Sequence, residues 1–242
     1  MFGKKSTVSL PFFYIEQIDL SQSFIELNED TSRHIVQVLR MKPGEKLNLT
    51  DGNGYSISAE IESAHKKHCR ARIIAQQFIP AAGTKISIAI SLIKNTNRFE
   101  WFLEKATEIG VAEIIPLICE RTEKQTFRSD RMKNILVSAM LQSQQYRLPL
   151  LHEPASFETV ADKSEQQQKF IAHCLEDGKQ NLGDLSPAIA ESKIILIGPE
   201  GDFTKEEIEF AMQRQFVPVS LGDNRLRTET AGIVAATLMK FG

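Results

Sequence analysis

The sequence has few cysteines and no long apolar run, and each absence disfavours a class of protein. Its three cysteines, Cys69, Cys119 and Cys174, form no C-x-x-C pair, and its five histidines form no H-E-x-x-H pair. A zinc site and a disulfide framework are therefore disfavoured. No stretch approaches the roughly 18 apolar residues of a membrane helix, and residues 1–17 lack the apolar core of a signal peptide. We expect a cytoplasmic protein with no metal and no membrane partner.

The net charge also lacks a dominant sign. There are 29 Lys and Arg residues against 31 Asp and Glu residues, which gives a formal net charge of −2 in 242 residues. This balance excludes a generally basic coat for nucleic acid but leaves a local basic surface open. With 42% hydrophobic residues, the chain can form one or two domains with sizeable cores.

The first 75 residues have the pattern of short strands separated by turns. Strand-forming segments lie at 24–27, 45–50, 55–61 and 70–75, and DGNG at 51–54 is a hairpin signal. Residues 28–41, with Ile35, Val36, Val38 and Leu39, suit a short helix. The spacing predicts a small barrel or compact sheet. A segment with Pro and Gly at 76–84 is the expected linker.

From residue 85 strands alternate with helices, which is typical of an α/β fold with a parallel sheet. We expect strands at 85–93, 113–119, 169–175, 193–198 and 217–222, and helices at 98–110, 130–143, 205–215 and 228–242. Gly110 should cap the first helix, and Thr204 with Glu207 should form a capping box for the third. The last helix is apolar nearly all round, so we expect it to be buried on every side, by this chain or by a partner subunit.

A glycine-rich turn, Gly198-Pro199-Glu200-Gly201, follows a predicted strand. Ligands of parallel sheets bind beyond the carboxyl ends of the strands. This turn has no lysine, matches neither phosphate-binding fingerprint, and is followed by a second carboxylate, Asp202. It therefore favours a ligand with hydroxyls, an amine or a positive centre. A plain strand-to-helix turn remains the alternative.

A second polar segment, residues 220–232, also follows a predicted strand. Arg225 and Arg227 could clamp a phosphate or orient a base. Capping by Thr228 and a favourable dipole position for Glu229 would be a purely structural account, but it leaves both arginines unexplained. Trp101, beside Arg98, belongs either to a solvated helix face or to a surface that contacts nucleic acid.

Taken together, several segments resemble one family. ILIGPEGDFTKEEIEFA (195–211) and LGDNRLRTETAGIVA (221–235) resemble the carboxyl-terminal half of the RsmE family. These are SPOUT-class methyltransferases that act on N3 of a uridine in small-subunit (16S) ribosomal RNA. RFEWFLEKATEIGV (98–111) matches in the same order, and HIVQVLRMKPGEKLNLTDGNG (34–54) resembles the family's PUA-like RNA-binding domain.

The resemblance implies a SPOUT-type parallel sheet with a carboxyl-terminal trefoil knot, preceded by a small mainly-β PUA-like barrel. The expected division is a PUA-like domain at 1–75, a linker at 76–84 and a methyltransferase domain at 85–242. S-adenosyl-L-methionine is the implied cofactor, and the implied partners are a second copy in a homodimer and small-subunit rRNA, free or within the 30S subunit. The implied cofactor residues are Ile197, Gly198, Pro199, Glu200, Gly201, Leu221, Gly222, Leu226, Arg227 and Thr228. A third cofactor loop should lie near His173 to Glu176.

The chain departs from the family pattern at several positions. Asp202 stands where a second glycine is common, and Asp223-Asn224 replaces Pro-Arg. Arg225 stands where an aliphatic is common, and Leu141 and Gln145 replace a glutamate and an arginine.

For the chemistry, our hypothesis is that Arg227 orients the base and that Glu229 takes the N3 proton; a structural role for Glu229 is the alternative. The residues predicted to contact RNA are Arg33, Arg40, Lys66, Lys67, Arg70, Arg72, Lys94, Arg98, Arg121, Arg147 and Arg225. The rival classes are an RNA-binding protein without catalysis, a SPOUT methyltransferase acting on another RNA, and a dehydrogenase-like domain, which the missing Rossmann fingerprint disfavours.

Overall fold

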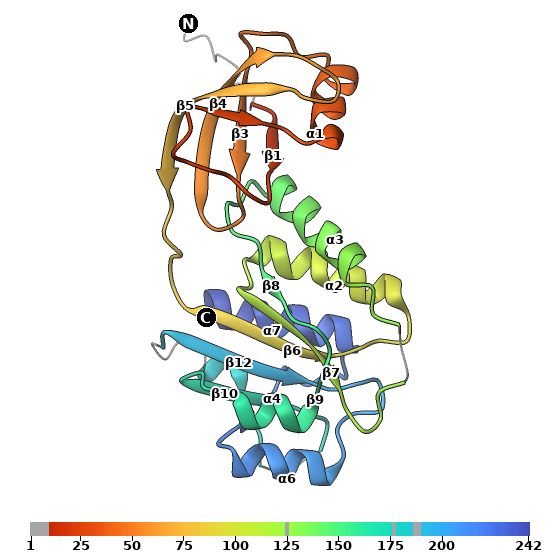
Figure 1. Cartoon of the computed structure of the whole chain (residues 1–242). Coiled ribbons are helices and arrows are strands. Elements are labelled where there is room, and N and C mark those ends of the chain that lie inside the picture. The colour runs from red at the N-terminus through yellow and green to blue at the C-terminus, as the bar shows by residue number, and fades with distance from the viewer. Residues whose placement is uncertain (1–9, 124–125, 176–177, 186–189) are drawn as a thin grey trace, which may run out of the picture. The chain divides into compact units, whose positions relative to one another are not determined.

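The chain forms two compact units (Figure 1). The computed structural model describes residues 10–123, 126–175, 178–185 and 190–242. The first unit ends at Ala81 and also includes Leu141–Arg147, and the second comprises Ala82–Met140 and Leu148–Gly242. Each unit has its own hydrophobic core.

The first unit is built on a curled five-stranded sheet with the order β1-β3-β4-β5-β2. The strands are β1 (Phe12–Tyr14), β2 (Phe24–Glu26), β3 (Lys46–Thr50), β4 (Tyr55–Ser63) and β5 (Arg70–Phe78). β3 and β4 pair antiparallel around residues 51–54, so the predicted hairpin is confirmed. β5 runs on to Phe78, into the segment expected to be a linker. The alternating inward side chains of β3 and β4 fill the core with Leu47, Leu49, Ile57, Ala59 and Ile61.

The helical segment of this unit is shorter than expected. Helix α1 (Glu29–Arg33) passes into a π-helical turn, η1 (His34–Val38). Ile35 is fully buried, whereas Val38 and Leu39 are exposed. The backbone N–H of Leu39 bonds to the carbonyl of His34 at 2.9 Å. Because this wider turn shifts the later positions, they no longer share the face of Ile35.

The second unit contains a parallel sheet with the order β11-β13-β10-β12-β6-β7-β8, and β9 also pairs with β7. Its strands are β6 (Lys85–Ser91), β7 (Glu113–Ile118), β8 (Leu150–Leu151), β9 (Ala155–Ser156), β10 (Gln168–Ala172), β11 (Gln180–Asn181), β12 (Ser192–Ile197) and β13 (Val217–Ser220). All five predicted strands are present. The sequence did not reveal β8, β9 and β11, because two-residue strands carry no periodicity.

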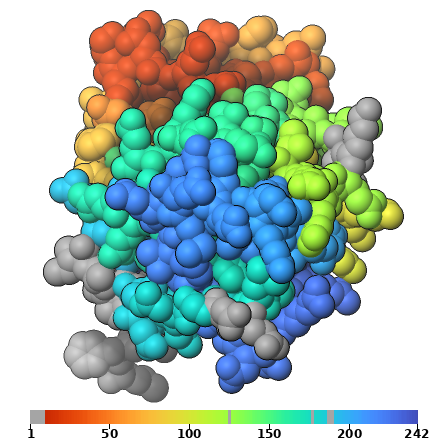
Figure 2. Space-filling model, turned by 90° about the horizontal axis from the view of Figure 1, so that it is seen from below, coloured from red at the N-terminus to blue at the C-terminus, as the bar shows by residue number. Residues whose placement is uncertain are grey.

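Helices cover both faces of this sheet, as Figure 1 shows. Helices α2 (Thr96–Ile109), α3 (Ser129–Gln142) and α7 (Thr228–Phe241) pack on one face. Helices α4 (Phe157–Lys163) and α6 (Lys205–Gln213) pack side by side on the other, the face seen in Figure 2. A short helix, α5 (Leu182–Leu185), contacts α7. Among the described residues, no helix is long and apolar enough to cross a membrane.

Both predicted helix caps are confirmed. Gly110 ends α2 in the left-handed conformation with φ +86°, and Thr204 and Glu207 form the capping box of α6. Helix α7 is partly buried within the single chain, where Ile233 and Leu238 pack against the core but stay partly exposed. Its burial on every side by a partner subunit stays a prediction. The covered face packs tightly, because a Cβ at Gly232 would lie 2.7 Å from the ring of Phe102.

Candidate cofactor site

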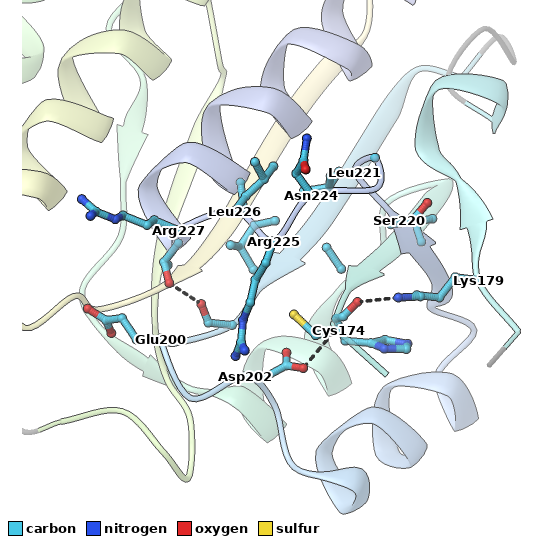
Figure 3. A pocket seen from close by; sticks show the side chains of 18 of the residues that line it. Cys174, Lys179, Glu200, Asp202, Ser220, Leu221, Asn224, Arg225, Leu226 and Arg227 are labelled. Carbon is cyan, nitrogen blue, oxygen red and sulfur yellow. Dashed lines mark hydrogen bonds between the residues drawn. The ribbon is translucent and has the colours of Figure 1, made fainter. Parts of the chain in front are cut away.

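Three loops of the second unit enclose a cavity of about 590 Å³. They follow β10, β12 and β13, which are neighbours in the sheet and run parallel. Their carboxyl ends therefore meet at one edge, where ligands of parallel sheets bind. The lining residues are Ala172, His173, Cys174, Lys179, Ile197, Gly198, Pro199, Glu200, Asp202, Val219, Ser220, Leu221, Gly222, Asp223, Asn224, Arg225, Leu226, Arg227, Thr228 and Ala231 (Figure 3).

Nine of the ten residues predicted to bind a cofactor line this cavity, and Gly201 does not. A Cβ at Gly201 would face the side chain of Arg121 at 3.4 Å. The carbonyl of Gly201 also accepts a hydrogen bond from Arg121 Nη1 at 2.7 Å. Gly201 thus connects the cofactor turn to the segment after β7 rather than to the cavity.

The turn after β12 is closed by its own backbone. The N–H of Asp202 donates to the carbonyl of Pro199 at 2.9 Å, and Asp202 has a left-handed φ of +64°. Few side chains adopt this conformation readily, although Asp is among the more tolerant. At the start of the turn a Cβ on Gly198 would lie 3.2 Å from the ring of Phe203. The turn therefore favours glycine at position 198 and, at position 202, a residue that adopts a left-handed backbone conformation.

The loops after β12 and β13 are joined by a buried hydrogen bond. Thr228 Oγ1 donates to the carbonyl of Gly198 at 3.0 Å. Helix α7 begins at Thr228, and its N-cap is Arg227, whose side chain makes no capping bond. A capping role for Thr228 is therefore wrong, because its hydroxyl bonds to the neighbouring loop instead.

The third loop contributes His173 and Cys174 to the cavity; Glu176, at the end of the expected range, lies outside the described residues. The ring of His173 has a buried Nδ1 with no hydrogen-bond partner among the described residues. Burial and the nearby charge of Lys179 lower the pKa of His173, against the opposing effect of Asp202. At neutral pH this ring is uncharged, and its buried nitrogen can bond to a ligand.

The two candidate catalytic residues are placed differently. Arg227 is exposed and lines the cavity, and in Figure 3 it points away from the side on which Arg225 extends toward Asp202. Glu229 does not line the cavity and is only 7% exposed. Its Oε1 lies 3.7 Å from Nε of Arg98, and its Oε2 is buried without a partner among the described residues.

Many of the cations predicted to contact RNA are already paired with carboxylates. The pairs are Arg33 with Glu29, Lys67 with Glu29, Arg70 with Glu62, Arg72 with Glu60, Lys94 with Glu123 and Arg98 with Glu229. Arg40 and Lys66 are exposed, and Arg225 lines the cavity. Apart from Arg98 with the buried Glu229, these pairs are exposed and therefore weak, so an RNA phosphate could compete for the paired cations.

Arg147 makes structural contacts within the first unit. Its Nη2 donates to the carbonyl of Ile79 at 2.8 Å, and its guanidinium lies over the ring of Phe78. A Cβ on Gly54 would lie 2.5 Å from the same nitrogen. This packing could not be predicted from the sequence, because the partners are far apart in the chain.

Sequence reasoning also missed Lys179 as a cavity residue. It lies just before β11, a strand of two residues, and belongs to no motif. Ser220 and Ala231 were likewise not singled out, although each lies within or directly beside a predicted loop. No group of His, Cys, Asp or Glu side chains in the described part of the chain could hold a metal ion.

Comparison with known proteins identifies both units. Residues 80–240 match the model of an RNA methyltransferase domain, and residues 27–74 match an RNA methyltransferase PUA domain. A probable rRNA-methyltransferase from Porphyromonas gingivalis is 39% identical, with a TM-score of 0.87 over 94% of this chain and 95% of that one.

Two further relatives have more specific names. A ribosomal RNA small subunit methyltransferase E from Neisseria gonorrhoeae, bound to S-adenosyl methionine, is 29% identical, with a TM-score of 0.83 over 95% of this chain and 96% of that one. The protein of the same name from Rickettsia conorii is 29% identical over 94% of each chain. Because the matching domain spans most of the sequence, the chain belongs to the RNA methyltransferase family defined by that domain.

Proposed function

We propose that this protein transfers the methyl group of S-adenosyl-L-methionine to N3 of a uridine in small-subunit (16S) ribosomal RNA. The observation that carries the proposal is the three-loop cavity at the carboxyl ends of β10, β12 and β13. It lies in a chain of the RNA methyltransferase family, and the solved relative from Neisseria gonorrhoeae is described as bound to this cofactor.

The chemistry of the cavity suits this cofactor. A volume of about 590 Å³ lies within the usual range for small-molecule sites. Glu200 and Asp202 offer carboxylates to hydroxyls, an amine or a positive centre, and the buried Nδ1 of His173 needs a partner. We infer that Ile197, Leu221 and Leu226 supply apolar contacts, while Gly198 and Gly222 let the backbone approach closely.

When bound, the cofactor supplies an electrophilic methyl group. The residues of this chain must hold the uracil with N3 in line with that group and favour loss of the N3 proton. Arg227, exposed at the start of α7 beside the cavity, is our candidate for orienting the base and stabilising its anion. Glu229 is our candidate proton acceptor, because its buried Oε2 has no partner in the described part of the chain.

We further infer that the first unit, with the PUA match at residues 27–74, is the RNA-binding domain and that the protein acts in the cytoplasm. The part of the expected linker 76–84 that follows β5 would connect this domain to the methyltransferase domain. Exposed cations such as Arg40 and Lys66 would contact phosphates. Binding of small-subunit RNA should then weaken steeply with added salt. An affinity that does not change between low and high salt would argue against this surface.

We also infer a homodimer and a trefoil knot formed by the loops after β12 and β13. The family resemblance suggests both. The partly exposed apolar side chains of α7, such as Ile233 and Leu238, support a dimer, because a second copy would cover them. Light scattering at micromolar concentration should give a mass near twice 27.2 kDa; the mass of one chain would contradict the dimer.

Two measurements test the function. Isothermal calorimetry should show S-adenosyl-L-methionine binding, whereas an RNA-binding protein without catalysis should show none. The purified protein should then restore a primer-extension stop at one uridine of small-subunit RNA from a strain that lacks the enzyme. A stop that never returns, or methylation found only in another RNA, would contradict the proposal.

A further inference from the structure

One peptide group of the third loop is bound at both ends by oppositely charged side chains. The N–H of Cys174 donates to Oδ2 of Asp202 at 2.8 Å. The carbonyl of His173, which belongs to the same peptide group, accepts a hydrogen bond from Nζ of Lys179 at 3.2 Å. Figure 3 shows both bonds as dashed lines beside the cavity.

The two charges match the dipole of this peptide. A peptide is positive at its N–H and negative at its carbonyl, and here the carboxylate lies at the first and the ammonium at the second. Hydrogen bonds to charged groups are stronger than neutral ones. Rotating the peptide plane would break both bonds and place each charge near a dipole end of its own sign. The pair therefore fixes the direction in which His173 and Cys174 leave the backbone.

Asp202 is itself held in place. Its N–H is bonded to Pro199, its φ is +64°, and the preceding Gly201 accepts the hydrogen bond from Arg121. A glycine at 202 would adopt the same backbone conformation more easily but would leave the N–H of Cys174 without its carboxylate. The aspartate thus accepts some backbone strain and gains a bond between the loops after β12 and β10.

We propose that Asp202 and Lys179 are positioning residues that clamp the His173–Cys174 peptide and thereby preform the third loop of the cofactor site. The inference rests on the proposed function for the identity of the ligand. A preformed loop loses less conformational freedom when the ligand binds. Both residues should therefore affect cofactor affinity more than the rate of methyl transfer at saturating cofactor.

Two variants at position 202 separate the backbone from the carboxylate, and one at position 179 removes the ammonium. Asp202→Gly keeps the left-handed conformation and removes the acceptor. Asp202→Asn tolerates the same conformation and keeps an acceptor oxygen without the charge. Lys179→Met removes the ammonium while keeping most of the aliphatic stem. Glu209→Gln and Lys205→Met, exposed charges on α6, are matched controls for the loss of one charge.

Calorimetry with S-adenosyl-L-methionine is the main measurement. We expect Asp202→Gly and Lys179→Met each to raise Kd by about 5- to 20-fold, near the low end for loss of one charge-assisted hydrogen bond, because the two bonds are exposed or only partly buried. Asp202→Asn should recover most of the affinity, and both controls should bind like the wild type. Because both residues hold one peptide, the double variant Asp202→Gly with Lys179→Met should lose less affinity than the product of the two single losses.

Two readouts exclude a general loss of structure. In the protein without cofactor, the amide of Cys174 should exchange its hydrogen faster in Asp202→Gly, while amides of β12 should be unchanged. In steady-state assays the KM for the cofactor should rise while kcat stays within about twofold of the wild-type value. This combination shows the loss of an interaction that stabilises the bound cofactor and the transition state equally.

The outcomes distinguish this proposal from the function on which it rests. If the wild type binds the cofactor and Asp202→Gly binds equally well with unchanged Cys174 exchange, the clamp is wrong and the function stands. If the affinity falls alike in Asp202→Asn and Asp202→Gly while the Cys174 amide exchanges at the wild-type rate in both, the charge on residue 202, and not the bond to Cys174, sets the affinity, which overturns the clamp. If the wild type binds no cofactor at all, the function and the clamp's role in it both fail.

Discussion

The hydroxyl of Thr228 donates a hydrogen bond to the carbonyl of Gly198 across 3.0 Å, although the two residues are 30 positions apart. Gly198 begins the turn after β12, and Thr228 is the first residue of α7. Both residues are buried and both line the cavity. The bond therefore joins two of the three loops at the point where each leaves regular structure.

Replacing Thr228 with valine should weaken cofactor binding. Valine has nearly the same shape but no hydroxyl, so the buried carbonyl of Gly198 loses its partner at a cost of about 1–3 kcal/mol. We expect lower thermal stability and a higher Kd for S-adenosyl-L-methionine by calorimetry. Thr228→Ser, which keeps the hydroxyl, is the control and should bind nearly as well as the wild type. Equal affinities for the valine and serine variants would contradict a role for this bond.

Replacing Arg121 with methionine should affect the cofactor rather than the RNA. Arg121 supports the cofactor turn through the carbonyl of Gly201, and methionine keeps the apolar stem without the donors. Because the guanidinium is exposed, we expect a loss of only about 0.5–1.5 kcal/mol in cofactor affinity, measured by calorimetry. RNA affinity, measured by filter binding, should stay within about twofold of the wild type, and its salt dependence should not change. If Arg121 contacted an RNA phosphate, its loss would lower both the affinity and the salt dependence. A large fall in RNA affinity with unchanged cofactor affinity would return Arg121 to the RNA surface.

The sequence was sufficient to predict most of the framework around this site. Buried strands and amphipathic helices carry strong periodicity, so the five main strands and the caps at Gly110 and Thr204 were predicted correctly. Contacts between distant loops leave no local pattern. The bonds of Thr228 to Gly198 and of Arg121 to Gly201 join residues 30 and 80 positions apart, and neither partner's sequence neighbourhood indicates the other.

Asp202 shows how a departure from a family pattern gains a physical reason from the structure. From the sequence, Asp202 was only a departure from the family pattern, an aspartate where a glycine is common. The structure places it at φ +64°, where glycine is favoured, and gives its carboxylate a partner in Cys174. Lys179, at the other end of the same peptide, could not be found from sequence because it lies in a segment without a motif.

Replacing Glu113 with glutamine should lower stability in a pH-dependent way. Burial by itself raises the pKa of Glu113, but hydrogen bonds from Lys85 and Ser87 (2.8 and 2.6 Å) lower it overall. A carboxyl whose pKa is lowered by folding stabilises the fold at every pH above its unfolded-state pKa, which is about 4.3. This contribution to stability is lost as the pH falls through the folded-state pKa. For Glu113→Gln we expect the free energy of unfolding at pH 7, measured by urea unfolding, to fall by about 1–2 kcal/mol. The difference from the wild type should shrink below pH 4; a constant difference would contradict the assignment.

Replacing Gly54 with alanine should destabilise the first unit. The new Cβ would lie 2.5 Å from Nη2 of Arg147 and 2.8 Å from the carbonyl of Ile79, at φ +110°. Gly44 is the matched control, because it has a similar φ of +89° but nothing within 4 Å of the added atom. Gly44→Ala should lower the free energy of unfolding by about 1 kcal/mol through backbone strain alone. Gly54→Ala should lower it clearly more, and thermal unfolding of both variants measures the difference. Equal losses of stability in the two variants would show that the side chain of Arg147 moves away from the added Cβ at little cost.

Cys174 should be the cysteine that reacts with iodoacetamide in the folded protein, and the cofactor should protect it. Cys174 is exposed beside the cavity, whereas Cys69 and Cys119 are buried. Burial, with a smaller effect from Glu207, raises the pKa of Cys119 to about 12, so its thiol stays protonated at ordinary pH. Burial and the charge of Asp202 also raise the pKa of Cys174, so its reaction should be slow at pH 7.

Mass spectrometry of peptides labelled at pH 7 and pH 9 measures both effects. Since only the thiolate reacts, the rate at Cys174 should rise nearly tenfold per pH unit below its pKa and should fall when S-adenosyl-L-methionine is added. Cys174→Ser is the control and should remove native-state labelling. Labelling of Cys69 or Cys119 without denaturant would contradict their burial. An unchanged rate at Cys174 with saturating cofactor would show that the third loop lies outside the bound site.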